Sequence, residues 1–399
     1  MNLAKRLQLI KPSPTLMVTV QVAALRRQGI AVIDFGAGEP DFDTPEHIKD
    51  AAITALKQGK TKYTPVGGTA ELKEAIITKL QRDNGLTYSI QEVTANCGGK
   101  HTLFNAFHAL FGEGDEVLIP APYWVSYSDM VILAGGQPKL LPTTEETGFK
   151  ITAPQLQKAL GPQSKALLLN SPSNPTGAAY SEDELRQLAD VVEQSHLIVI
   201  SDDVYEKFLY DTPRCPHLLT LKPHLRDRVL VANSVSKTYA MTGWRLGYAA
   251  GPREVIGAIE TLQSQSTSNP TSITQAAAVA ALTGDQEPVG IMAKEFAKRR
   301  NYVVQRLRAI PGIACTLPEG AFYVFPRVST YFGAKWQDNT ITSAMALSLY
   351  LLQEAKVAVV AGEGFGSPDH LRISYATSMQ NLEQGLDQIE AALKRLGSL

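Results

Sequence analysis

The sequence predicts an α/β protein with a mostly parallel central sheet flanked by helices, joined to a smaller α+β part. Short apolar runs recur through the middle of the chain, as in strands covered on both faces, and helical stretches separate several of them. Strands that alternate with helices at this spacing imply right-handed crossovers and a parallel sheet. A chain of 399 residues, 44% of them hydrophobic, can bury such a core without disulfides or metals.

The apolar runs define the expected strands of the central sheet. In chain order they lie at 92–96, 116–119, 139–141, 166–170, 197–201, 229–233 and 246–251. A helix is expected at 181–194, because its Ser-Glu-Asp-Glu start resembles a capping box.

A different pattern follows the last of these strands. The sequence predicts a charged helix at 293–310, short strands near 321–325 and 371–375, and a closing helix at 378–396. We therefore expect three regions: 1–49 as an N-terminal arm and part of a small domain, 50–290 as the large α/β domain, and 291–399 as the small C-terminal α+β domain.

The composition excludes several classes of protein. The 38 Lys and Arg residues nearly balance 39 Asp and Glu residues, so no overall charge favours nucleic acid or an anionic membrane. Cys97, Cys215 and Cys315 show no disulfide or metal-ligand spacing, and no Cys/His cluster occurs, so we expect no metal and a reducing, cytoplasmic location. No apolar stretch is long enough to span a membrane.

The N-terminus is basic, and its first acidic residue is Asp34. A transit peptide is also poor in acidic residues, but Pro12 and Pro14 interrupt a long amphipathic helix here. We therefore expect an ordered N-terminal arm.

Ligands of an open parallel sheet bind beyond the carboxyl ends of its strands, so the residues after each strand matter most. Cys-Gly-Gly-Lys at 97–100 follows the strand at 92–96 and precedes a helix. Two glycines there expose N–H groups that suit a phosphate, or they form a plain tight turn. A Walker A loop is excluded, because Thr94 and His101 stand where it needs Gly and Ser or Thr.

Two further strands end in polar residues. Ser-Pro-Ser-Asn-Pro-Thr-Gly at 171–177 is a stiff loop that presents Asn174, or an ordinary connection. Asp202 directly follows the strand at 197–201, where it is either a chemical group or the N-cap of a helix.

Lys237 and Arg245 follow the strand at 229–233, and no acidic residue lies within 228–253. A desolvated lysine has a lowered pKa and can form a Schiff base, although a lysine here can also be a surface residue. Arg245 would suit a phosphate, or it is a surface cation.

Arg372 alternates with its apolar neighbours in the strand near 371–375. Its guanidinium could bind a carboxylate through two hydrogen bonds, or line an exposed strand face. An acid, an amide, a lysine and phosphate donors after successive strands together fit one ligand, pyridoxal phosphate.

Seven motifs carry a family resemblance that runs from about residue 10 to the end: GEPDFDTP, KYTPVGG, PYWVSY, NSPSNPTG, SDDVYE, SKTYAMTGWRLGY and HLRISYATS. The chain resembles class I aminotransferases of the aspartate type, in particular the bacterial branch that handles aspartate and, in some members, prephenate. The resemblance implies pyridoxal-phosphate fold type I and a homodimer with active sites at the subunit interface. The implied reaction is ping-pong amino transfer between L-aspartate or L-glutamate and 2-oxoglutarate or oxaloacetate.

The same resemblance assigns roles to residues around the cofactor ring. Lys237 is expected to hold the cofactor and act as the base. Asp202 is expected to pair with the ring nitrogen, Asn174 and Tyr205 to contact the phenolic oxygen, and Trp124 to stack on the ring.

Further roles concern the phosphate and the substrate. The expected phosphate contacts are Gly99, the backbone of Lys100, Ser234, Ser236, Arg245 and, from the other subunit, Tyr63. The expected substrate contacts are Gly38 and Arg372 at the α-carboxylate, with Trp124, Asn174, Lys100 and Thr15.

The chain departs from the family pattern at two places. Gly98 lacks the hydroxyl of some relatives, so phosphate contacts there are expected from the backbone. Animal-type enzymes bind the distal carboxylate with an arginine of the neighbouring subunit, but Gln-Ser-Gln-Ser occupies 263–266 here. Lys100 with Thr15 is expected to take that role, and the pair also resembles the one associated with prephenate.

Other functions remain open at this point. An aminotransferase of the same fold could prefer aromatic or alanine-type donors. Ser-Val-Ser-Lys at 234–237 also matches the Ser-x-x-Lys of acyl-transfer enzymes, but their Ser-Asp-Asn and Lys-Thr-Gly motifs are absent. A nicotinamide dehydrogenase would need a third glycine after Gly36 and Gly38. A non-catalytic sensor of this fold would need a fused binding domain, for which the motifs leave no room.

Overall fold

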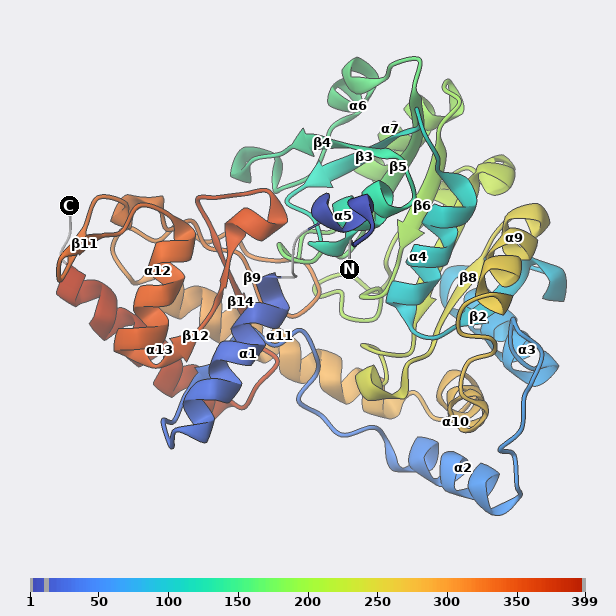
Figure 1. Ribbon diagram of the computed structural model, residues 1–399, viewed down its shortest axis with the longest axis horizontal. Helices are drawn as coiled ribbons and strands as arrows, with labels where there is room; N and C mark the ends of the chain where they lie inside the picture. Colours follow the sequence, from blue (N-terminus) through green and yellow to red (C-terminus); the bar gives the residue numbers. More distant parts are fainter. Residues whose placement is uncertain (1–2, 11–13, 397–399) are drawn as a thin grey trace.

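A seven-stranded sheet forms the centre of the computed structural model, which describes residues 3–10 and 14–396 (Figure 1). The strand order is β2-β8-β7-β6-β5-β3-β4. The strands are β2 (Val93–Asn96), β3 (Glu116–Ala121), β4 (Gln137–Pro142), β5 (Ser164–Asn170), β6 (Ile198–Asp202), β7 (Val229–Ser234) and β8 (Gly247–Ala250). Each predicted strand is confirmed to within two residues at either end.

The sheet is parallel except for β8, which pairs antiparallel with both β7 and β2. Only a short connection joins β7 to β8, with Arg245 in the left-handed conformation at φ 55°. A connection without a crossover helix returns the chain alongside its own strand, and the antiparallel pair results.

Alternate strand residues pack on opposite faces of the sheet. In β5, Ala166 and Leu168 belong to one apolar cluster, while Leu167 and Leu169 belong to the other. Because both faces are covered, these strands read as continuous apolar runs.

Helices cover both faces of this sheet (Figure 1). The helices of this part are α2 (Glu46–Lys57), α3 (Ala70–Lys79), α4 (Gly99–Leu110), α5 (Ser126–Leu133), α6 (Ala153–Ala159), α7 (Glu182–Glu193), α8 (Leu218–Leu221), α9 (Arg253–Ser264) and α10 (Ser272–Thr283). Of these, α2 packs against α10, which packs against α3. The predicted capping box of α7 is confirmed, because Ser181 and Glu184 each accept the other's backbone N–H.

The remaining elements gather beside the central sheet (Figure 1). They are α1 (Pro14–Arg27), β1 (Ile33–Asp34), α11 (Glu287–Arg308), β9 (Tyr323–Val324), β10 (Lys335–Trp336), β11 (Asn339–Thr340), α12 (Ala344–Tyr350), β12 (Val357–Ala358), β13 (Val360–Ala361), β14 (Leu371–Ser374) and α13 (Met379–Leu396). The antiparallel sheet β13-β14-β9 lies at their core.

One helix begins earlier than predicted. The helix expected from 293 begins at Glu287, because Pro288 fits the first turn, where no N–H is needed. In the N-terminal arm, for which no helix was predicted, α1 begins at Pro14. None of the helices within 3–10 and 14–396 has the length and hydropathy to cross a membrane, and no cluster of potential metal ligands occurs among the same residues.

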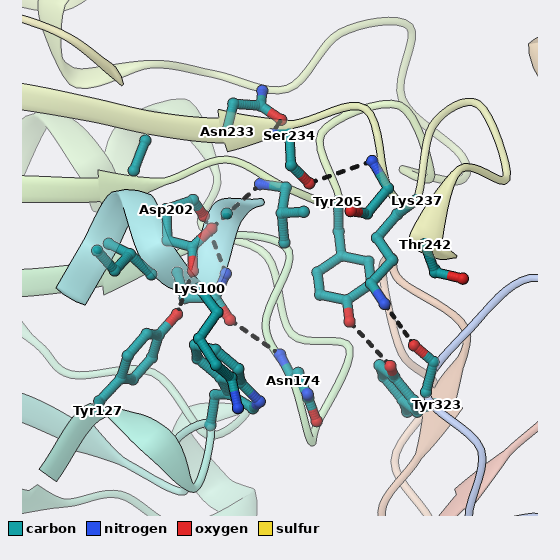
Figure 2. Close-up of a pocket in the computed structure, with 18 of the residues that line it drawn as sticks. Lys100, Tyr127, Asn174, Asp202, Tyr205, Asn233, Ser234, Lys237, Thr242 and Tyr323 are labelled. Carbon is teal, nitrogen blue, oxygen red and sulfur yellow. Dashed lines mark hydrogen bonds between the residues drawn. The ribbon is translucent and has the colours of Figure 1, made fainter. Parts of the chain in front are cut away.

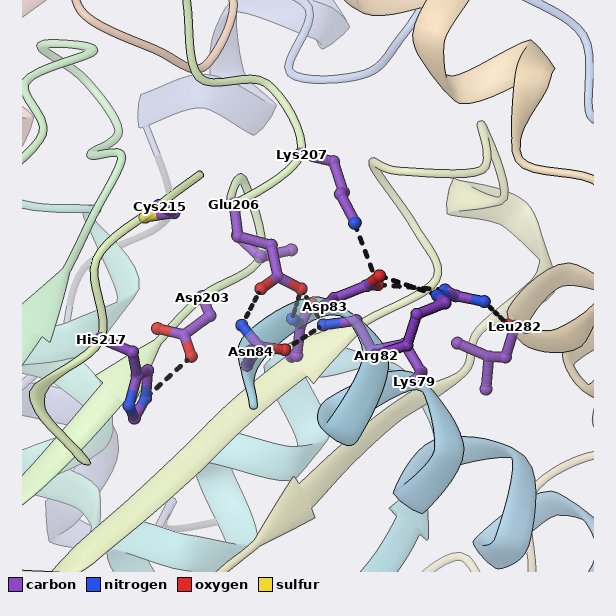
Figure 3. Close-up of polar contacts among 12 residues, drawn as sticks. Lys79, Arg82, Asp83, Asn84, Asp203, Glu206, Lys207, Cys215, His217 and Leu282 are labelled. Carbon is purple, nitrogen blue, oxygen red and sulfur yellow. Dashed lines mark hydrogen bonds and ion pairs between the residues drawn. The ribbon is translucent and has the colours of Figure 1, made fainter. Parts of the chain in front are cut away.

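A network of buried polar side chains stabilises the ends of the strands (Figure 3). Lys79, at the end of α3, forms an ion pair with Glu206, and these residues are 3% and 7% exposed. Asn84 and Asn233 donate to the two oxygens of Glu206 at 2.5 and 2.8 Å. Asn233 in turn accepts the N–H of Ser234 at 2.7 Å, so the network fixes the end of β7.

We predict that Lys79→Met lowers the free energy of unfolding by about 3–5 kcal/mol, because it leaves Glu206 charged and unpaired in the interior. Urea unfolding of the purified variant measures this loss. Lys49→Met is the control, since Lys49 pairs with Glu46 on the surface and its loss should leave stability almost unchanged. Equal stability of both variants would contradict the prediction.

Candidate active site

The carboxyl ends of the parallel strands open into a cavity of about 310 Å³ (Figure 2). Twelve residues predicted from the sequence line it: Gly38, Gly99, Lys100, Trp124, Asn174, Asp202, Tyr205, Ser234, Ser236, Lys237, Arg245 and Arg372. They come from β6, β7, α4, β14 and the loops between, so residues far apart in the chain meet at one place.

Asp202 ends β6 with its carboxylate directed toward the cavity (Figure 2). Its Oδ2 accepts the hydroxyl of Tyr127 at 2.5 Å, and its Oδ1 accepts the N–H of Val204 at 3.3 Å. No helix begins after β6, so the N-cap alternative is wrong. Burial raises the pKa of Asp202 to about 6. A carboxylate in this position can hold a proton on a basic ring nitrogen.

Lys237 lies just after β7, and its Nζ donates to the carbonyl oxygen of Gly38. It borders the cavity, so the surface alternative is wrong. Burial lowers the pKa of Lys237 to about 8; the charge of Glu39 opposes this shift, and those of Arg372 and Arg245 add to it. With this lowered pKa, far more of the Lys237 amine is neutral at neutral pH than in an ordinary lysine, so Lys237 is a candidate nucleophile and base.

The glycine pair begins α4 as predicted, with Gly98 at φ 97° and Gly99 as the first helical residue. A Cβ on Gly98 would stand 2.4 Å from Nη2 of Arg245, so glycine lets that guanidinium approach the helix N-terminus. Ser234 lies beside Gly99, and its Oγ accepts the N–H of Ser236 at 3.3 Å. A cation, hydroxyls and free N–H groups in one place fit a phosphate.

Arg372 is 2% exposed, so the alternative of an exposed strand face is wrong. Its Nη1 donates to Oδ1 of Asn174 at 3.0 Å, and its Nη2 donates to the carbonyl of Gly36 at 2.7 Å. Its buried Nε has no hydrogen-bond partner within the described part of the chain. A buried guanidinium without a carboxylate is suited to bind the carboxylate of a small molecule.

Lys100 reaches over Trp124, with its Nζ 5.0 Å from the ring centroid. The pKa of Lys100 is lowered, first by desolvation and second by the charge of Arg245. Lys100 and Arg245 thus place two cations in the cavity.

The roles of two predicted residues stay predictions. Tyr63 is 92% exposed, and the structure of one chain leaves its expected contact with another subunit a prediction. Thr15 belongs to α1, but its side chain lies outside the described residues, so its role also stays a prediction.

The lining residues that the sequence analysis missed include three with polar groups at the site: Asn170, Tyr127 and Tyr323. Asn170 ends β5, and its side chain accepts the N–H of Asn174 and donates to the carbonyl of Asp202. Its position at a strand end was a usable signal. The tyrosines gave none, because tyrosine within an apolar segment is usual for a core.

A lysine, a phosphate-type loop and a buried arginine in one cavity are the groups that an enzyme with a phosphate-bearing carbonyl cofactor and a carboxylate substrate would need. The chain matches the family model for aminotransferase class I and II over residues 30–389. The chain belongs to this family, whose cofactor is pyridoxal 5′-phosphate, and the site fits that group.

The similarity to known proteins covers nearly the whole chain. An aspartate aminotransferase of Geobacillus stearothermophilus is 48% identical, covering 98% of both chains. An aspartate/prephenate aminotransferase of Nitrosomonas europaea is 47% identical over 98% of this chain and all of its own. A crystal structure of the aspartate aminotransferase from Rhizobium meliloti superposes with a TM-score of 0.95 at 47% identity, covering 99% of both chains. The predicted fold class is thereby confirmed.

We predict that the cofactor-free wild-type protein loses stability relative to Asp202→Asn as the pH rises from 4 to 7. Native Asp202 binds a proton up to a pKa of about 6, whereas the unfolded carboxyl loses it near 3.8, so stability that is present below 3.8 is lost through pH 6. The relative change between pH 4 and 7 is roughly 2–2.5 kcal/mol. Urea unfolding at four pH values measures it, and parallel curves for the two proteins would refute it.

Proposed function

We propose that this chain is an aspartate aminotransferase, which transfers the amino group between L-aspartate or L-glutamate and 2-oxoglutarate or oxaloacetate. The observation that carries the proposal is one cavity in which Lys237, Asp202 and Arg372 converge. The names of the relatives from Geobacillus stearothermophilus and Nitrosomonas europaea support the same substrate. We favour aspartate over aromatic or alanine-type donors, because Lys100 lines the cavity as a cation in addition to Arg372 and to Arg245 at the phosphate position.

The protein's groups divide the chemistry among them. Pyridoxal phosphate, when bound, supplies the carbonyl that takes the amino group and a ring that accepts electrons. Arg372 binds the substrate α-carboxylate and thereby orients the Cα–H bond. Lys237 takes the Cα proton on its Nζ and returns it. Asp202 keeps a proton on the ring nitrogen, while Asn174 and Tyr205 donate to the phenolic oxygen.

We propose that two copies of the chain form a homodimer in the cytoplasm. The exposed Tyr63 would reach the phosphate of the partner's site. Residues 50–290 would form the large cofactor-binding domain, while 1–49 and 291–399 supply the arm and the small domain. In this arrangement Arg372 brings the small domain to the substrate.

Lys100 is proposed to bind the distal carboxylate, with Thr15 assisting. Prephenate, like oxaloacetate, carries a second carboxylate besides that of its oxo-acid group, so the same cation can serve both. The relative from Nitrosomonas europaea, named an aspartate/prephenate aminotransferase, supports prephenate as a second acceptor.

Visible absorption of the protein reconstituted with pyridoxal phosphate tests the function directly. We expect a yellow protein that aspartate alone converts to the pyridoxamine form, and Lys237→Ala should still bind the cofactor but lose turnover. Lys222→Ala is the control, because Lys222 pairs with Asp190 and Glu193 on the surface. Substantial turnover by Lys237→Ala would exclude the assigned base, and a yellow wild type unmoved by aspartate would exclude the substrate.

We predict that Lys100→Ala lowers kcat/KM for aspartate and for prephenate by about 10- to 100-fold, the usual effect of losing a hydrogen bond to a charged group. The kcat/KM for phenylalanine, which has no distal carboxylate, should fall much less. Steady-state kinetics with the three substrates measures the difference. Equal losses would argue against the distal role of Lys100, and a wild type inactive on prephenate would remove that substrate alone.

A further inference from the structure

Tyr323 lies at the wall of the cavity, and no role has so far been given to its hydroxyl. It belongs to β9, its side chain is fully buried, and its hydroxyl lies 2.8 Å from that of Tyr205 (Figure 2). A Cβ on Gly38 would stand 3.2 Å from the same oxygen. The backbone of Gly38, whose carbonyl accepts a hydrogen bond from Lys237, therefore packs closely against the Tyr323 hydroxyl.

The hydrogen bond between the hydroxyls of Tyr323 and Tyr205 can run in either direction. Only one direction gives both protons an acceptor when a further oxygen lies beside Tyr205. If Tyr205 donated to Tyr323, the proton of Tyr323 would need another acceptor, and none is found among the described residues. If Tyr323 donates to Tyr205, the proton of Tyr205 is left for an oxygen in the cavity. Buried donors are almost always paired, so the second order is favoured when such an oxygen is present.

The charge around Tyr323 strengthens this order. The guanidinium of Arg372 lies over the Tyr323 ring, 4.5 Å from its centroid. Burial raises the pKa of Tyr323, and the nearby Arg372 charge acts in the opposite direction. Burial also raises the pKa of Tyr205 well above its usual range. Both groups are therefore neutral donors at physiological pH, and the cation polarises the O–H of Tyr323.

We propose that Tyr323 is a positioning residue that donates to Tyr205 and thereby strengthens the hydrogen bond from Tyr205 to the cofactor's phenolic oxygen. This inference rests on the proposed function. The phenolic oxygen shares a proton with the nitrogen that joins Lys237 to the cofactor. A stronger bond from Tyr205 stabilises that oxygen without the proton, so it lowers the pH at which the nitrogen deprotonates.

The experiment is a pH titration of the visible absorption of the holoenzyme. In Tyr323→Phe we expect the midpoint to rise by about 0.2–0.5 pH unit, the size of a cooperative contribution from one hydrogen bond. Tyr375→Phe is the matched control, because its buried hydroxyl donates to the carbonyl of Ala321 and does not line the cavity. Its midpoint should equal that of the wild type.

The path through Tyr205 is tested by a double-mutant cycle. Tyr205→Phe should raise the midpoint further than Tyr323→Phe, and adding Tyr323→Phe to it should produce no further rise. Incorporation of 3-fluorotyrosine at 323 retains the hydroxyl, makes it more acidic and should lower the midpoint. This variant decides the question should Tyr323→Phe fail to fold.

Each outcome separates the inference from the proposed function. A wild type that gains no visible band with pyridoxal phosphate overturns the function itself. A wild type that titrates normally, with an unchanged midpoint in Tyr323→Phe, overturns only the inference. The same holds if Tyr323→Phe raises the midpoint equally with and without the hydroxyl of Tyr205, since Tyr323 would then act independently.

Discussion

The burial of two opposite charges at the ends of neighbouring strands governs this site. Asp202 ends β6 and Lys237 follows β7, and burial moves the pKa of each toward neutrality, to about 6 and about 8. Neither group is paired with an ion of the protein at close range: Asp202 accepts hydrogen bonds from Tyr127 and Val204, and Lys237 donates to a carbonyl. A buried charge without a counter-ion raises the free energy of the folded protein. A ligand that pairs with either group would therefore stabilise the protein.

Two adjacent carboxylates at the end of β6, Asp202 and Asp203, lie in different surroundings. Strand alternation sends Asp202 into the cavity and Asp203 to the other face. There Asp203 accepts the hydroxyl of Ser201 at 2.6 Å, and Nε2 of His217 lies 3.3 Å away (Figure 3). Burial alone would raise the pKa of Asp203, but these partners lower it. The partners of Asp203 therefore keep it in its charged form, whereas Asp202 binds a proton more readily.

The sequence predicted those parts of the site that follow from strand order. Because parallel strands end at one edge, Asp202 and Lys237 could be placed together without coordinates. The direction of β8 could not be predicted, since it depends on how the short turn at Arg245 closes. Tyr323 was also missed: it lies on a two-residue strand, and its meeting with Tyr205 depends on packing between segments 118 residues apart.

Arg372 joins the two groups of elements, and its contacts connect the proposed substrate position to Tyr205. It extends from β14 to Asn174 and Gly36, while its ring contact with Tyr323 leads to Tyr205. A substrate carboxylate would neutralise the guanidinium, whose own pKa is lowered by burial. The charge that polarises Tyr323 would then be reduced at the moment of binding. In the proposed function, a cation that anchors the substrate would thus also alter the hydrogen-bond donors that face the cofactor, and this would link substrate binding to the proton affinity at Lys237.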